Sequence, residues 1–240
     1  VAARFIPKTG AAAPHLVVTK NPLKSTFALI SELREDHRLW TGGLITSWFW
    51  LVGAVALSLL PVMLKDGMNG TQGLITLGLL VFTVGIAVGS FLAAKASRMR
   101  PNMALVPVGA FLMALASFDL AWTAWGLVRA AEPMGIETFL ASFTGLRLAT
   151  GLFVLSLAGG LFIVPAFAAV QLWARDDHKA RVVAACNILS AAFIVGGSLL
   201  LAALLLAGYG TASLFLMLGA ANLVALGLVL KAWGKHGLKD

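Results

Sequence analysis

The sequence predicts an all-α membrane protein with six transmembrane helices. Six apolar runs separated by short charged loops carry this prediction, and each matches the roughly 20 residues that cross a ~30 Å hydrocarbon layer as a helix. The runs lie at about 41–64, 71–94, 102–128, 148–172, 182–207 and 211–230. Composition agrees, because 60% of the residues are hydrophobic and 12% are charged, too few to cover a soluble domain of this length.

The basic residues predict which way the helices cross the membrane. Six crossings place both termini on one side, and that side carries 15 of the 18 Lys and Arg residues. The three on the other side are Lys65, Arg129 and Arg147. Basic residues collect in cytoplasmic segments, so we expect both termini in the cytoplasm. The net charge of +8 then indicates topology and contact with anionic lipid headgroups rather than binding to nucleic acid.

The composition outside the spans divides the chain into three parts. These are a cytoplasmic linker and interfacial segment at 1–38, the transmembrane bundle at 39–233 and a cytoplasmic tail at 234–240. Residues 1–24 are rich in Ala, Pro, Lys and Thr, which is typical of a linker, and 31–38 form a charged interfacial segment. Because the chain opens at Val1 without an initiator Met or a signal peptide, we interpret it as a fragment.

The first span carries three candidate residues for a substrate pathway, Ser47, Trp48 and Trp50, in the run ITSWFW. By helical rise the two tryptophans lie ~12–15 Å inside the span, deeper than the interfacial belt that Trp usually occupies. The three side chains can line a cavity, or they can pack between helices.

Glycines predict where helices approach closely. Gly85 and Gly89 are four residues apart in the second span, and two adjacent pairs follow, Gly159–Gly160 in the fourth span and Gly196–Gly197 in the fifth. Small residues at such positions allow close helix packing in membranes.

Two charged residues, Asp119 and Arg147, accompany the third and fourth spans. If the fourth span begins near Phe139 instead of 148, Arg147 is buried and can pair with Asp119. If it begins near Arg147, the guanidinium extends to the interface. A third interpretation has Arg147 contact an anionic substrate, since intramembrane charges often serve function. Asp119 is expected to be a structural intramembrane charge.

Two uncharged polar residues also lie in apolar runs: Gln171 in the fourth span and Asn187 in the fifth. A hydrogen bond between helices is the ordinary explanation for such residues. A place on a substrate pathway is the alternative.

The sequence contains no motif for catalysis or metal binding that we would expect in an enzyme. H-E-x-x-H, a P-loop and G-x-S-x-G are all missing. The four histidines lie in arms or loops without metal-ligand spacing, and the single cysteine, Cys186, lies inside the fifth span. We therefore expect no enzymatic activity, no metal and no cofactor in this chain.

Six helices with cytoplasmic ends behind a basic linker resemble the C-terminal half of a major facilitator superfamily transporter. The family motif G-x-L-A-D-R-x-G-R-R after the second span has a degenerate counterpart here, from Gly89 through Lys95 to Arg98. The acidic position is Ala93 and the second glycine is Ala96, so a charge-relay gate built on the acid is in doubt. The resemblance implies a gating role for this loop.

Four longer segments, at 47–61, 84–98, 159–174 and 180–197, are similar to the bacterial lysophospholipid transporters, especially those fused to a glycerophospholipid acyltransferase. That family moves lysophospholipid, chiefly lysophosphatidylethanolamine, from the outer to the inner leaflet of the inner membrane for reacylation. The acyltransferase motif H-x-x-x-x-D is missing from these 240 residues. The partners implied are the bilayer, the lysophospholipid, an N-terminal six-helix half and an acyltransferase.

The resemblance also implies an architecture of two inverted three-helix repeats, 41–128 and 139–230, beside a central site. Arg147 would then attract the phosphate, and Trp48 and Trp50 would contact the ammonium group or the acyl chain. Two other functions stay open. One is a major facilitator exporter of drugs or small solutes, and the other is a membrane anchor for an acyltransferase that transports nothing.

Overall fold

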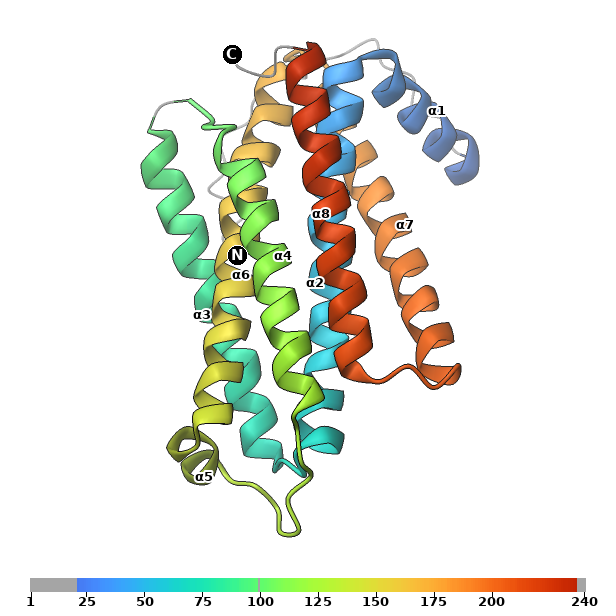
Figure 1. The fold of residues 1–240 in the computed structure, drawn as a ribbon. Coiled ribbons are helices and arrows are strands. Elements are labelled where there is room, and N and C mark those ends of the chain that lie inside the picture. Colours follow the sequence, from blue (N-terminus) through green and yellow to red (C-terminus); the bar gives the residue numbers. More distant parts are fainter. Residues whose placement is uncertain (1–20, 99, 237–240) are drawn as a thin grey trace, which may run out of the picture.

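The computed structural model describes residues 21–98 and 100–236, and in that part of the chain the regular secondary structure is helical (Figure 1). Six helices are long and apolar enough to cross a membrane, which confirms the predicted all-α fold and supports a multi-pass membrane protein. They are α2 (His37–Pro61) with η2 (Val62–Gly67), α3 (Gln72–Ser97), α4 (Leu105–Trp125), α6 (Phe143–Trp173), α7 (Lys179–Leu206) and α8 (Thr211–His236). Two shorter helices are α1 (Pro22–Glu35) and α5 (Ile136–Ala141).

Helix α1 begins earlier than the composition suggests. Residues 22–24, which composition assigns to the linker, already belong to this helix, since it starts at Pro22. The Asn21 side-chain oxygen accepts hydrogen bonds from the amides of Leu23 (3.0 Å) and Lys24 (3.2 Å) and so satisfies the first free donors. Proline suits this first position because it has no N–H to satisfy. Residues 1–20 and 237–240, with the rest of the predicted linker and tail, lie outside the described residues.

The fourth span has a defined start between the two predicted alternatives. Helix α6 begins at Phe143, after the short helix α5, and the Ser142 hydroxyl accepts a hydrogen bond from the Gly145 amide at 3.0 Å. Arg147 is therefore in the second turn of the helix, about 6 Å from its first residue by helical rise.

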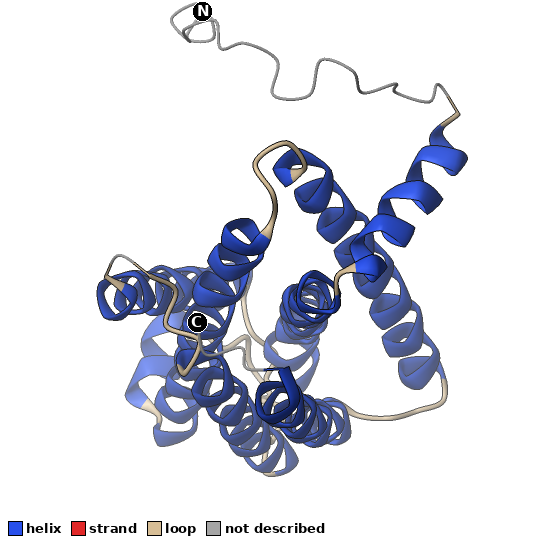
Figure 2. Cartoon of the chain, turned by 90° about the horizontal axis from the view of Figure 1, so that it is seen from above, coloured by secondary structure: helices blue, strands red, loops and turns tan. Residues whose placement is uncertain are grey.

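The helices run alternately up and down, so the loops collect at two ends of the bundle (Figure 1). Helix α1, the loops after α3 and α6 and the last turn of α8 lie at one end, which we call the basic end. Lys65 in η2, Arg129 in the loop after α4 and Arg147 in the second turn of α6 belong to the opposite end. By their place in the elements, the other Lys and Arg residues of the described part belong to the basic end. Seen along the bundle, α1 crosses its edge beside α7 (Figure 2).

Close packing between α3 and α6 is the most extensive interhelical contact. Three of the predicted glycines, Gly85, Gly89 and Gly160, are the reason, whereas a Cβ on Gly196 would meet open space. A Cβ atom on Gly89 would lie 2.0 Å from the Leu157 carbonyl oxygen, and one on Gly160 would lie 2.6 Å from the Ser90 amide nitrogen. Gly85 meets the Ser156 side chain in the same seam. The two backbones approach as small residues permit in membrane bundles.

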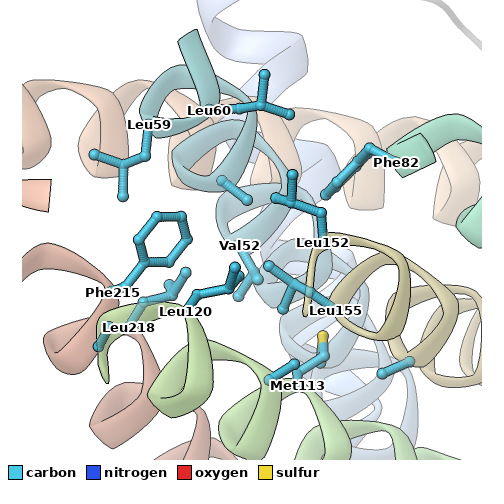
Figure 3. Close-up of a cluster of buried hydrophobic side chains, with 14 of the residues drawn as sticks. Val52, Leu59, Leu60, Phe82, Met113, Leu120, Leu152, Leu155, Phe215 and Leu218 are labelled. Atoms are coloured by element: carbon cyan, nitrogen blue, oxygen red, sulfur yellow. The ribbon is translucent and has the colours of Figure 1, made fainter. Parts of the chain in front are cut away.

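The apolar core lies where α2, α3, α4, α6 and α8 meet (Figure 3). Its fully buried side chains include Leu59, Leu120, Leu152 and Phe215. Helix α7 is the least buried of the six long helices.

The helix pairs repeat with one exception. If the first three spans (α2, α3, α4) correspond to the last three (α6, α7, α8), the α2–α7 contact corresponds to the α6–α3 contact. Both contacts are extensive. By the same correspondence, the contact between α4 and α6 corresponds to the contact between α8 and α2. Helix α4 packs closely on α6, whereas α8 makes only a small contact with α2. This difference leaves space beside α2.

Candidate functional site

Ser47 lies in the contact between α2 and α7. The side chain is fully buried. Its hydroxyl donates to the Gly43 carbonyl oxygen at 2.7 Å and lies 3.2 Å from the Ser190 hydroxyl of α7. The structure thus places Ser47 in interhelical packing, the second of the two sequence interpretations.

Trp48 connects α2 to α8. Its indole N–H donates to the Asn222 side-chain oxygen at 2.9 Å. Asn222 is fully buried, and its Nδ2 group has no hydrogen-bond partner among the described residues. Sequence reasoning missed Asn222, although an amide in the apolar run of α8 is the same kind of signal as Asn187.

A cavity of about 550 Å³ opens next to Trp48, between α2, α7 and α8. It falls within the ~300–1,000 Å³ typical of small-molecule sites. Its inner wall is apolar and includes Trp48, Phe162 and Phe193. His37, the first residue of α2, and Lys231, near the C-terminal end of α8, line it toward the basic end of the bundle. The cavity occupies the space that the small α2–α8 contact leaves open.

Trp50 does not share this cavity. At 100° per residue, side chains two positions apart on a helix point in nearly opposite directions. The Trp50 side chain is 49% exposed and stands edge-on to Phe49, with ring centroids 5.4 Å apart. The two predicted tryptophans therefore belong to different surfaces of α2.

Arg147 pairs with Asp119, as the first of its sequence interpretations has it. The Nε atom of Arg147 donates to the Asp119 carboxylate at 3.0 Å, and its Nη2 atom donates to the same oxygen. Both side chains are about one-third exposed, at 34% and 39%. A phosphate that bound this guanidinium would have to compete with the carboxylate. The arrangement favours a structural role for both residues.

Gln171 and Asn187 are exposed on the bundle surface. Neither side chain has a hydrogen-bond partner among the described residues, so the interhelical bond that would ordinarily explain them is not found there. Asn187 is eight residues into α7, about 12 Å along the helix. An amide at this depth faces lipid only at a cost, since hydrocarbon offers no hydrogen bonds.

The three residues of the degenerate family motif lie in the second half of α3 and at its C-terminal cap. Gly89 is buried in the seam with α6, as described above. Lys95 and Arg98 are exposed at the basic end, and Arg98 ends the helix with φ of 48°. Gly89 thus has a packing role whether or not the loop acts as a gate.

A cluster of charged groups that sequence reasoning missed holds α1 on α7. Arg181 donates from Nε to the Glu32 carboxylate at 2.7 Å, and Nδ1 of His178 lies 2.5 Å from the other carboxylate oxygen. The hydrogen bond from Arg181 lowers the pKa of Glu32 below its ordinary value of 4.5, partial burial opposes this shift, and the contact with His178 adds to it. The spacing of Glu32 and Arg181 in the sequence, 149 residues, gives no local signal.

The described residues contain no group of three or more His, Cys, Asp or Glu side chains that could hold a metal ion. Comparison with known proteins adds no assignment: no protein-family model matches the chain, and no curated protein or solved structure does. The family resemblance of the sequence therefore stays a prediction.

Proposed function

We propose that this chain is the C-terminal six-helix half of a major facilitator transporter, in a bacterial inner membrane, that moves lysophospholipid from the outer to the inner leaflet. The exposed amide of Asn187 on α7, about 12 Å into the least buried span, is the observation that carries the proposal. A polar group at that depth is explained when a water-filled cavity or a second helical bundle covers it.

The helix pairing supports the architecture. The α2–α7 contact of one repeat corresponds to the α6–α3 contact of the other, and both are extensive. Two inverted repeats require such corresponding contacts. An N-terminal half placed against α7 would cover its exposed face, including Asn187. Both halves together would then form the substrate pathway.

The substrate class rests on the four segments that are similar to lysophospholipid transporters. A lysolipid also fits a pathway that combines an exposed aromatic residue, Trp50, with polar groups such as Asn187. Orientation follows from charge, with the basic end in the cytoplasm. An acyltransferase, fused or separate, would consume the delivered lysolipid. In this proposal the chain itself catalyses no reaction.

The test is leaflet transfer of labelled lysophosphatidylethanolamine in proteoliposomes that contain the complete protein, both halves included. We expect transfer by the wild type and a loss of at least several-fold in Asn187→Leu at equal reconstitution. Ala220→Leu, an exposed position on α8, is the matched control and should transport normally.

Each alternative function has its own result in this assay. Transfer that generic cationic dyes inhibit and unlabelled lysolipid does not would favour a drug or solute exporter. A folded protein that moves no lysolipid but supports acyltransferase activity would favour the membrane anchor. Normal transfer by Asn187→Leu would remove α7 from the pathway.

A further inference from the structure

The cavity between α2, α7 and α8 has the size, depth and charge of a site for one membrane lipid. We infer that it binds a phospholipid with an anionic headgroup from the leaflet at the basic end, with one acyl chain inserted beside Trp48. This inference rests on the cavity alone and does not depend on transport.

The depth of the cavity matches one leaflet. Its lining on α2 runs from His37 to Trp48, eleven residues or about 16 Å by helical rise. Half of a ~30 Å hydrocarbon layer is about 15 Å. An acyl chain that enters at the basic end would therefore reach its full depth near Trp48.

The walls suit a hydrocarbon chain better than water. Leu44, Phe193 and Leu228 contribute apolar surface, and the indole N–H of Trp48 is already bonded to Asn222. A water-filled cavity needs polar partners for its waters. An apolar acyl chain gives up no hydrogen bonds at such walls and gains dispersion contacts.

The mouth of the cavity provides charge complementarity. Lys231 is exposed there and forms no ion pair among the described residues. His37 lies across the mouth, with Thr41 one turn below. The neighbouring Asp36 carboxylate is used to cap α2, since it accepts the amides of Arg38 and Leu39. A phosphate at this position would meet the ammonium group of Lys231.

The cavity lies where α8 makes only a small contact with α2, unlike the corresponding pair α4 and α6. A lipid chain in the opening would supply the contacts that α8 lacks. The uneven pairing of the helices and the cavity thus have one explanation.

The experiment is native mass spectrometry of the complete protein, delipidated in detergent and titrated with dioleoyl phosphatidylglycerol, dioleoyl phosphatidylcholine or lysophosphatidylglycerol. We expect one tightly retained lipid, with phosphatidylglycerol preferred. Lys231→Gln should reduce that preference roughly fivefold, the effect of one basic residue near an anionic headgroup. Lys95→Gln, an exposed lysine at the same end, should leave it unchanged.

Two variants fill the cavity from opposite walls. Ala225→Trp on α8 and Leu44→Trp on α2 should each abolish the retained lipid, while Ala220→Trp on the exposed surface of α8 should keep it. Helicity and monodispersity identify variants that fold. Undiminished lipid retention in a folded filling variant would overturn the site. Equal retention of the two lipids by the wild type would overturn its anionic specificity, and retention of lysophosphatidylglycerol alone would overturn the assignment to a bilayer lipid.

Discussion

At the scale of single residues, glycine determines how closely α3 and α6 approach. Gly89 faces the backbone of Leu157, which cannot rotate away as a side chain can. The same residue type at Gly196, on α7, has open space where a Cβ would be. The same glycine-to-alanine substitution at these two positions therefore separates two effects on stability: the loss of close packing and the intrinsic preference of a helix for alanine.

Gly89→Ala should lower the free energy of unfolding by about 1–3 kcal/mol, because the added methyl group forces the two backbones apart. Gly196→Ala should leave it unchanged or raise it by up to ~1 kcal/mol, since alanine favours the helix. Unfolding in detergent, followed by circular dichroism, measures both. Equal effects would contradict the close approach of α3 and α6.

The Arg147–Asp119 pair predicts coupling between two substitutions. Arg147→Gln and Asp119→Asn should each lower the apparent melting temperature, because each leaves its partner charge without a counterion. The double variant should lose less than the sum of the two. A double-mutant cycle of melting temperatures measures the coupling. Additive losses would mean that the two side chains do not interact.

At the scale of elements, α1 is held by one apolar contact and one polar cluster. Leu33 is buried beneath it against α2 and α7, with Gly43 and Cys186 close by. Glu32 adds the bonds to Arg181 and His178, and His178 also faces Asp177 at 3.5 Å. The attachment of α1 thus depends on the charge of Glu32.

Glu32→Gln should loosen α1 at neutral pH by about 1 kcal/mol, a value reduced for the partial exposure of the pair. Faster hydrogen exchange confined to the amides of α1 would show this. Glu35→Gln, an exposed position without an ion pair among the described residues, is the control and should exchange as the wild type does.

The same cluster sets a pH dependence. The pKa of Glu32 is lower in the folded protein than its ordinary 4.5, so its contribution to stability is complete above that value. The contribution is lost as the pH falls through the lowered pKa. The difference in melting temperature between wild type and Glu32→Gln should therefore shrink below pH 4.5. A constant difference down to pH 3 would contradict the role of the carboxylate.

At the scale of the whole molecule, orientation is a consequence of charge. In a Cys186→Ala background, Glu132→Cys at the end opposite α1 should react with an impermeant maleimide in intact cells. Arg100→Cys at the basic end should react only after permeabilisation. The reverse pattern would place the basic end outside the cell and contradict the predicted topology.

The six spans and their alternating direction could be predicted from sequence because each depends on a contiguous apolar run. The pairing of Arg147 with Asp119 was one of the predicted alternatives, since an unpaired charge in a span is costly. The choice between these alternatives depended on where α6 begins, and the Ser142 cap fixes that start. The Trp48–Asn222 bond joins residues 174 positions apart, and no local pattern indicates it.

The sequence by itself determined that this chain forms six helices long and apolar enough to cross a membrane and which end of the bundle is basic, because apolar length and charge act along the chain. Only the tertiary structure decided that Ser47 packs, that Trp48 borders a cavity and that Gln171 and Asn187 stand exposed. Those outcomes depend on which helices approach and which stay apart. The separation of α8 from α2 is such an outcome, since it arises from side-chain fit between helices at opposite ends of the sequence.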